Sequence, residues 1–250
     1  MVRMQCGLVK FSDVQAIAFD KDGTLADSEN FLRVLAQRRS RLIDARVPGV
    51  ESPLQLAFGL ESNSLNPAGL MAVGTRHENE IAAAAYVAET GRGWLESLTL
   101  VQAAFQEADQ SLPRKADHTP CYEEVAAVLK TLHAAGLKLA ILSSDTTEQV
   151  VDFAERYELT PYLEICQGTE AGPSKPDPAL LYQVCDALQV LPEHTLVVGD
   201  SQADVQLAIA AGAAGCIGIA RKPSTVPGLA HASVVIENLR EIQIPPQMPA

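Results

Sequence analysis

The chain has 250 residues, of which 47% are hydrophobic and 20% charged, and its formal net charge is -12. This length and apolar content are enough for one domain with an insertion or for two small domains. The acidic balance argues against a nucleic-acid partner, because such an interface needs clustered Lys and Arg. A small anion can still bind where a metal ion and one or two basic side chains are placed locally.

No apolar run reaches 18 residues, so the sequence predicts no transmembrane helix and no membrane partner. Residues 1–7 lack the long apolar core of a signal peptide. The five cysteines are scattered, and none of them forms a Cys-x-x-Cys pair, which is typical of small buried residues in a reduced chain. We therefore expect a cytoplasmic protein, and the sequence leaves its oligomeric state open.

The apolar run 14–19 contains β-branched residues and has the length of a buried strand. Asp20 and Asp22 follow it, and Gly23 and Thr24 predict a turn. A strand that ends in Asp-x-Asp brings two acids to the carboxyl edge of a sheet, where they repel each other when both are ionised. Such a pair needs a compensating cation or a chemical task. We interpret Asp20 as a metal-assisted nucleophile and Asp22 as its acid/base partner.

The stretch 28–112 has the composition of helices and shows no strand alternation. Glycines and polar residues break it near Gly59, Gly74 and Gly91, so we expect four or five helices in an all-α domain inserted after the first strand. The expected helices are 28–45, 53–58, 67–73, 78–90 and 94–109.

After a linker at 112–115, strand and helix patterns alternate to near the end of the chain. The expected strands are 137–142, 163–166, 195–198, 216–219 and 234–236, and the expected helices are 120–135, 146–157, 177–188 and 203–211. This alternation indicates βαβ units. We therefore predict an α/β fold. Its core is a Rossmann-like parallel sheet with helices on both faces (residues 1–27 and 113–250), and residues 28–112 form the inserted all-α domain.

Ligands of such sheets bind at the carboxyl ends of the strands, so the residues at those ends are the candidate site. They are Asp20-Lys21-Asp22, Ser143-Ser144-Asp145, Lys175 in the loop 172–176, and Asp200 and Asp204 in the segment 199–204. Each alone has an ordinary explanation, because acids often cap helices, serines favour turns and most lysines are exposed. The inference depends on their combination in this order.

These segments resemble the four motifs of the haloacid-dehalogenase-like (HAD) superfamily. The matching residues are Phe19-Asp20-Lys21-Asp22-Gly23-Thr24-Leu25, a strand ending in Ser143, Lys175-Pro176-Asp177-Pro178, and Val198-Gly199-Asp200-Ser201-Gln202-Ala203-Asp204. The resemblance covers about residues 12–27 and 113–240 and points to phosphoglycolate-phosphatase-like members. The helical insertion looks like the C1 cap domain of that family.

The resemblance implies that the chain is a phosphatase. Asp20 would attack phosphorus and form an aspartyl-phosphate. Asp22 would protonate the leaving oxygen and then activate water, and an acid at this position separates phosphotransferases from dehalogenases. The implied phosphate-binding residues are Asp22, Gly23, Ser143, Ser144 and Lys175.

The resemblance also implies Mg²⁺ as the cofactor, since hard oxygen ligands and phosphate chemistry suit this ion. Its ligands would be a side-chain oxygen of Asp20, the main-chain carbonyl of Asp22 and the side chain of Asp200. Asp204 would bind through water or orient the site. Lys21 stands where the family usually has an apolar residue, and we interpret it as structural or as a surface residue, because successive strand residues point to opposite faces.

The substrate is expected to be a small phosphorylated metabolite such as phosphoglycolate or a sugar phosphate. Arg76 and His77 at a helix start, and Arg92 between two glycines, are candidates for contacts that set specificity, although surface charges are usually only solvated.

Two alternatives stay open. A sugar-phosphate mutase of the β-phosphoglucomutase type would need a base soon after the first motif, and residues 30–34 contain no His. A catalytically silent HAD-like binding protein is disfavoured because all four motifs are intact.

Overall fold

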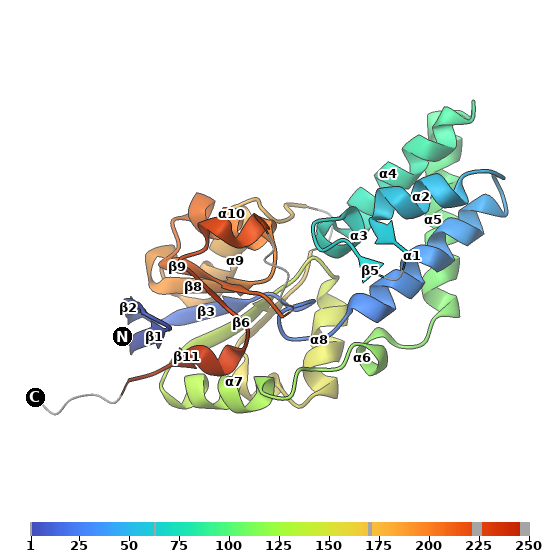
Figure 1. Cartoon of the computed structure of the whole chain (residues 1–250). Coiled ribbons are helices and arrows are strands. Elements are labelled where there is room, and N and C mark those ends of the chain that lie inside the picture. Colours follow the sequence, from blue (N-terminus) through green and yellow to red (C-terminus); the bar gives the residue numbers. More distant parts are fainter. Residues whose placement is uncertain (1, 63, 170–171, 222–226, 246–250) are drawn as a thin grey trace, which may run out of the picture. The chain divides into compact units, whose positions relative to one another are not determined.

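The computed structural model describes residues 2–62, 64–169, 172–221 and 227–245. The chain forms two compact units (Figure 1). The first unit consists of Met1–Asp27 and Cys121–Ala250, and the second of Ser28–Pro120. The second unit extends past the boundary expected at 112. The reason is a short helix, α6 (Lys115–His118), which the sequence pattern does not predict. This helix belongs to the second unit, and the ammonium of Lys115 lies 6.0 Å from the centroid of the Phe31 ring.

The core of the first unit is a parallel sheet with the strand order β10-β9-β8-β3-β6-β7. Its strands are β3 (Ala16–Phe19), β6 (Lys138–Leu142), β7 (Ile165–Gln167), β8 (Thr195–Gly199), β9 (Gly215–Ile219) and β10 (Val234–Ile236). The predicted α/β fold class is confirmed.

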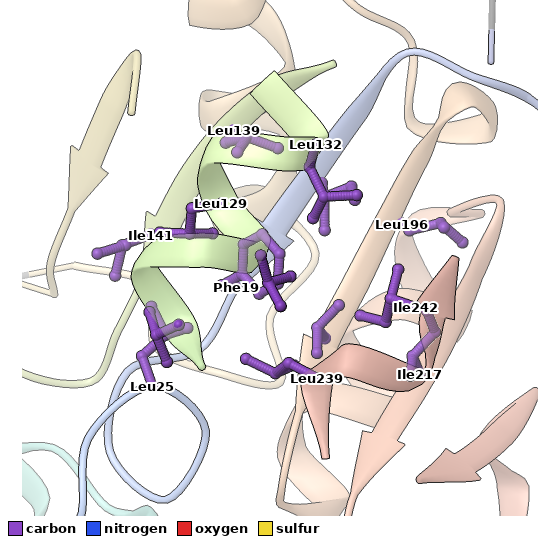
Figure 2. Close-up of a cluster of buried hydrophobic side chains, with 14 of the residues drawn as sticks. Phe19, Leu25, Leu129, Leu132, Leu139, Ile141, Leu196, Ile217, Leu239 and Ile242 are labelled. Atoms are coloured by element: carbon purple, nitrogen blue, oxygen red, sulfur yellow. The ribbon is translucent and has the colours of Figure 1, made fainter. Parts of the chain in front are cut away.

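The two faces of this sheet are covered by different helices (Figure 1). These helices are α7 (Val125–Ala134) and α8 (Thr147–Arg156) on one face, and α9 (Ala179–Leu188) and α10 (Gln202–Ala211) on the other. Because successive side chains of a strand point to opposite faces, Ile17 and Phe19 pack with α7 and α8, whereas Ala16 and Ala18 pack with α9 and α10. Figure 2 shows Phe19 together with Leu129 and Leu132 of α7. Burial on both faces explains the continuous apolar runs of these strands.

A small antiparallel sheet, which the sequence pattern does not predict, packs on the α7 side of the core. It consists of β1 (Val2–Cys6), β2 (Val9–Val14) and β11 (Ile242–Gln243). Met4 and Cys6 of β1 are buried in the main cluster, whereas Leu8 at the hairpin tip is 98% exposed. In β2 the alternation of buried and exposed residues is interrupted at Ser12 and Asp13, where the pairing with β1 shifts register, and this obscures the strand signal.

The second unit is mainly helical. Its helices are α1 (Glu29–Asp44), α2 (Glu51–Phe58), α3 (Leu70–Val73), α4 (Arg76–Glu89), α5 (Trp94–Ser111) and α6. The prediction of an all-α unit is wrong in one detail, since β4 (Leu60–Glu61) and β5 (Ser64–Leu65) form a short hairpin. This hairpin follows Gly59, which ends α2 in the left-handed conformation and turns the chain back.

The helix expected at 120–135 begins only at Val125. The residues before it pair with the first-motif turn instead: Cys121 forms a bridge with Ala26, and the Tyr122 N–H donates to the Leu25 carbonyl at 3.0 Å. The 3-10 helices are η1 (Thr160–Tyr162), η2 (Pro192–His194), η3 (Pro227–His231) and η4 (Leu239–Glu241). Among the helices of the described residues, none has the length and hydropathy needed to cross a membrane.

Truncation of Leu129 in α7 tests the main cluster, in which this side chain is fully buried. We expect Leu129→Ala to lower the free energy of unfolding by about 2–5 kcal/mol, because it removes buried methyl groups and leaves a cavity. Ile209→Ala on α10 is the control, since Ile209 is 62% exposed, and it should change stability by less than about 0.5 kcal/mol. Equal losses in urea denaturation would contradict this assignment of the core.

Candidate active site

The strand order reverses at β3, which lies between β6 and β8. In open α/β sheets this reversal marks the place, outside the carboxyl ends of the strands, where ligands bind. Three expected site residues follow these strands directly: Asp20 after β3, Ser143 after β6 and Asp200 after β8. The Asp20 N–H donates to the Val198 carbonyl at 2.8 Å, which continues the ladder of β3 and β8 up to the site.

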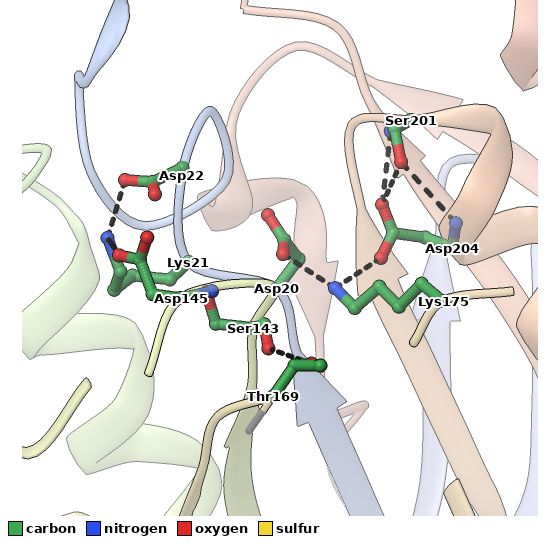
Figure 3. A network of polar contacts seen from close by, with 9 residues as sticks. All are labelled: Asp20, Lys21, Asp22, Ser143, Asp145, Thr169, Lys175, Ser201 and Asp204. Atoms are coloured by element: carbon green, nitrogen blue, oxygen red, sulfur yellow. Dashed lines mark hydrogen bonds and ion pairs between the residues drawn. The ribbon is translucent and has the colours of Figure 1, made fainter. Parts of the chain in front are cut away.

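Lys175 connects two of the acids (Figure 3). Its buried ammonium donates to Asp20 Oδ1 at 2.6 Å and to Asp204 Oδ1 at 2.7 Å. Burial disfavours the charge on Lys175, but the carboxylates of Asp20 and Asp204 outweigh it and raise the pKa of this lysine. Lys175 is therefore a fixed positive charge in the site.

Asp204 has a second task, because it lies in the first turn of α10 and is buried. Its Oδ2 accepts from the Ser201 N–H at 3.2 Å and from the Ser201 hydroxyl at 2.6 Å, and the Asp204 N–H donates to Ser201 Oγ at 3.4 Å. This reciprocal cap fixes the Asp204 side chain. Oδ1 of Asp204 thus accepts from Lys175 and Oδ2 from Ser201, and its role toward a metal ion, through water or by orientation, stays a prediction.

Side-chain oxygens of Asp20, Asp200 and Asp204 lie within 4.8 Å of one another. These three carboxylates, of which Asp20 and Asp204 contact Lys175, carry an excess of negative charge over that one lysine. Burial, together with Asp204 and Asp22, raises the pKa of Asp20 from 3.8 to about 7, although Lys175 lowers it. Burial, Asp20 and Asp204 also raise the pKa of Asp200 well above its ordinary value. A divalent cation with a preference for hard oxygen ligands, such as Mg²⁺, would relieve this repulsion.

Gly23 makes room for one of these acids. Its φ of +82° lies in the left-handed region, and a Cβ at this position would lie 2.0 Å from Asp200 Oδ2. The turn is closed by the Lys21 carbonyl, which accepts from the N–H groups of Leu25 at 2.8 Å and Ala26 at 2.9 Å. A residue without a side chain is therefore required here for two reasons, conformation and space.

Asp22 lies apart from the other acids and toward Lys21 (Figure 3). Lys21 Nζ lies 2.5 Å from Asp22 Oδ1 and 2.9 Å from Asp145 Oδ2, and its side chain is 1% exposed. Of the two interpretations of Lys21, as a structural or as a surface residue, the surface one is wrong. The reason is that β3 ends at Phe19 and strand alternation no longer applies at position 21. Burial opposes the charge of Lys21, but Asp145 and Asp22 outweigh it and raise its pKa.

Ser143 is buried at the end of β6. Its hydroxyl accepts from the Asp145 N–H at 3.2 Å, and its carbonyl accepts from the Thr169 hydroxyl at 3.0 Å. Ser144 lies in the same loop. Sequence reasoning missed the roles of Asp145 and Thr169. The position of Asp145, two residues after Ser143, was a usable signal, whereas Thr169 has no signal in the sequence.

Arg221 is a second residue that the sequence did not single out. It donates to the Thr24 carbonyl at 2.5 Å, pairs with Glu124, and its guanidinium carbon lies 3.8 Å from the Tyr122 ring centroid. These contacts attach the segment after β9 to the first-motif turn.

The three candidate specificity residues lie in the second unit. Arg76 pairs with Glu80 at 2.8 Å and also with Asp109. Arg92 donates to the Thr90 hydroxyl at 2.9 Å, and His77 is exposed. Contacts within the unit therefore account for the two arginines, and a substrate role for all three stays a prediction.

Comparisons with known proteins find similar sequences and similar folds. A family model described as haloacid dehalogenase-like hydrolase matches residues 14–212. A phosphoglycolate phosphatase of Vibrio vulnificus is 29% identical over 205 residues, which are 82% of each chain. A solved Haemophilus somnus structure described as a predicted phosphoglycolate phosphatase superposes with a TM-score of 0.67 at 20% identity, over 93% of this chain and 96% of that one. The solved structure of a HAD phosphatase from Thermococcus onnurineus superposes with a TM-score of 0.62 at 18% identity, over 91% of this chain and 95% of that one.

Replacement of Gly23 tests the contact with Asp200. We expect Gly23→Ala to abolish the rise in melting temperature that Mg²⁺ produces, because the new methyl group displaces the Asp200 carboxylate. Gly136→Ala is the matched control, since Gly136 has a φ of +83° and open space around its Cβ position. It should cost about 1 kcal/mol of stability from strain alone and keep the Mg²⁺ effect. A full Mg²⁺ effect in Gly23→Ala would contradict this geometry.

The raised pKa of Asp20 predicts how pH changes stability. Between pH 3.8 and about pH 7, Asp20 of the folded protein keeps a proton that the same residue has released in the unfolded chain. Without metal, this group therefore lowers the stability as pH rises through that window. Mg²⁺ binds the ionised carboxylates, so the rise in melting temperature with Mg²⁺ over EDTA should be larger above pH 7 than near pH 5. A rise that does not depend on pH would contradict the raised pKa.

Proposed function

The chain belongs to the haloacid dehalogenase-like hydrolases, and we propose that it is a Mg²⁺-dependent phosphatase that hydrolyses a small phosphorylated metabolite through an aspartyl-phosphate. The family predicted from the four motifs is confirmed, and so is the predicted class of enzyme, a phosphatase of this family. The metal, the intermediate and the substrate are the proposed part.

One observation carries the proposal: the buried contact of Lys175 with Asp20 and Asp204, beside Asp200, at the point where the strand order reverses. This arrangement combines an acid that can act as a nucleophile, a fixed positive charge and a set of hard oxygen ligands. Phosphoryl transfer through an aspartyl-phosphate uses these three elements, because it needs a carboxylate nucleophile and stabilisation of the negative charge on the transferring group.

In the proposed reaction, a carboxylate oxygen of Asp20 attacks phosphorus as the bond to the leaving oxygen breaks. The proton that the leaving oxygen needs comes from the carboxyl group of Asp22. Asp22 then takes a proton from water as that water attacks the aspartyl-phosphate, which releases phosphate and restores Asp20. General acid and base help of this kind contributes about 10²–10⁴-fold to a rate.

The donor set fits Mg²⁺, which would be held by the side chains of Asp20 and Asp200, by the main-chain carbonyl of Asp22 and, through water or by orientation, by Asp204. When bound, the ion reduces the repulsion between a carboxylate nucleophile and a phosphate dianion. Of the chain's own groups, Lys175 neutralises charge on the transferring phosphoryl group. Ser143, Ser144 and the N–H group of Asp22 donate to its oxygens. The Gly23 N–H, which was also expected to do so, donates instead to the Ala26 carbonyl at 2.9 Å.

Phosphoglycolate and sugar phosphates are the proposed substrates. Support comes from relatives named phosphoglycolate phosphatase, two of which share 29% and 27% identity with this chain over 82% and 81% of its length. The direct test is a screen for phosphate release over a panel of phosphometabolites and one aryl phosphate, with Mg²⁺ and with EDTA. Release that EDTA abolishes is the expected result. A hexose phosphate that is isomerised instead would indicate a mutase, and no release from any compound would indicate a silent binding protein.

The assignment of the nucleophile predicts that Asp20→Asn lowers phosphate release to below about one thousandth of the original rate, because loss of a nucleophile removes the covalent pathway. Asp186→Asn on the exposed side of α9 is the control for loss of one carboxylate, and it should keep full activity. If Mg²⁺-dependent release survived in Asp20→Asn, the nucleophile would be another group.

A further inference from the structure

The first unit holds a second buried lysine that the proposed reaction does not use. Lys21 stands between Asp20 and Asp22 in the sequence, and its side chain is 1% exposed. Its ammonium lies between Asp22 Oδ1 at 2.5 Å and Asp145 Oδ2 at 2.9 Å, two acids outside the Asp20–Asp200–Asp204 cluster. Figure 3 shows the two lysines on opposite sides of Asp20, each with its own pair of carboxylates.

The groups around Lys21 are themselves held in place. Asp145 donates its N–H to Ser143 Oγ at 3.2 Å, and its carbonyl accepts from the Thr169 N–H at 2.7 Å. The ring of Phe153, a buried residue of α8, has its centroid 5.4 Å from Lys21 Nζ. The ammonium of Lys21 is therefore fixed by the loop after β6 and by α8, and it in turn fixes the carboxylate of Asp22.

Stability alone does not account for a charged residue at this place. Removing an ammonium group from water costs free energy, and a buried ion pair can often be replaced by apolar side chains of similar volume without loss of stability. Geometry gives a stronger reason. A general acid must lie within about 2.6–3.2 Å of the atom that it protonates, and a displacement of about 1 Å can cost 10²-fold in rate.

We propose that Lys21 is a positioning residue, which holds the carboxyl group of Asp22 in the orientation that serves the leaving oxygen and ties the first-motif turn to the loop 143–145. The proposal rests on the proposed function, in which Asp22 is the acid and base. Lys21 does not touch the substrate in this account, and it acts through Asp22.

The test compares two substrates that differ in their need for an acid. An alkyl phosphate has a poor leaving group, which must be protonated, whereas the nitrophenolate of p-nitrophenyl phosphate leaves without a proton. We expect Lys21→Met to lower kcat/KM for the alkyl ester at least about tenfold more than for the aryl ester. Equal losses for the two esters would overturn the proposal, because a general structural defect affects both.

Lys138→Met is the matched control, since Lys138 is another lysine of the same sheet, placed at the start of β6, whose ammonium donates to the Leu188 carbonyl. It should leave the ratio of the two kcat/KM values unchanged. Asp145→Asn is a second variant, which keeps the contact between Lys21 and Asp22 but removes one anchor of the lysine. It should shift the ratio in the same direction by a smaller factor, so the proposal stays testable if Lys21→Met does not fold.

A double-mutant comparison shows whether Lys21 acts through Asp22. In an Asp22→Asn background, Lys21→Met should cause little further loss on the alkyl ester, because the group that it orients is already absent. Losses that multiply would overturn the positioning role. If the unmodified protein released phosphate from neither ester, the proposed function would fail and the role of Lys21 with it. An active protein in which Lys21→Met leaves the ratio unchanged would overturn the role of Lys21 alone.

Discussion

The ammonium of Lys175, buried between Asp20 and Asp204, is the interaction on which the rest of the site depends. It holds together a loop, the end of β3 and the first turn of α10, which are far apart in the sequence. One positive charge does not balance the three acids that lie within 4.8 Å of one another. Burial, together with the remaining repulsion, raises the pKa of Asp20 to about 7, and a divalent cation would relieve that repulsion.

Two features of the fold provide this arrangement: the order of the strands in the sheet, and single residues that each have two structural roles. The reversal of strand order at β3 places the ends of β6, β3 and β8 side by side. Asp204 caps α10 and accepts from Lys175, and Gly23 provides both the left-handed turn and the space that the Asp200 carboxylate fills. The same turn carries Asp22, whose partner Lys21 is fixed by a different loop. The two acids of the first motif thus have different environments although one residue separates them.

Much of this could be predicted from the sequence, because it depends on local patterns. The strand before Asp20, the alternation of strands and helices, and the acids at strand ends are local signals, and the parallel sheet follows from them. The small sheet of β1, β2 and β11 could not be predicted, since it pairs the two ends of the chain and its strands are short and irregular. The partners of Lys21 could not be predicted either, because Asp145 becomes its neighbour only when β3 and β6 pair.

In the proposed reaction, Asp20 carries the phosphoryl group during turnover. The most direct measurement is rapid acid quenching of the protein with its substrate and Mg²⁺, followed by mass spectrometry of the peptides. We expect one added phosphoryl group on the peptide that contains Asp20, and none on that peptide in Asp20→Asn. A phosphoryl group on another residue would contradict the role of Asp20 as nucleophile. So would an Asp20 peptide that stays unmodified during steady turnover at saturating substrate, under conditions in which hydrolysis of the intermediate is slow.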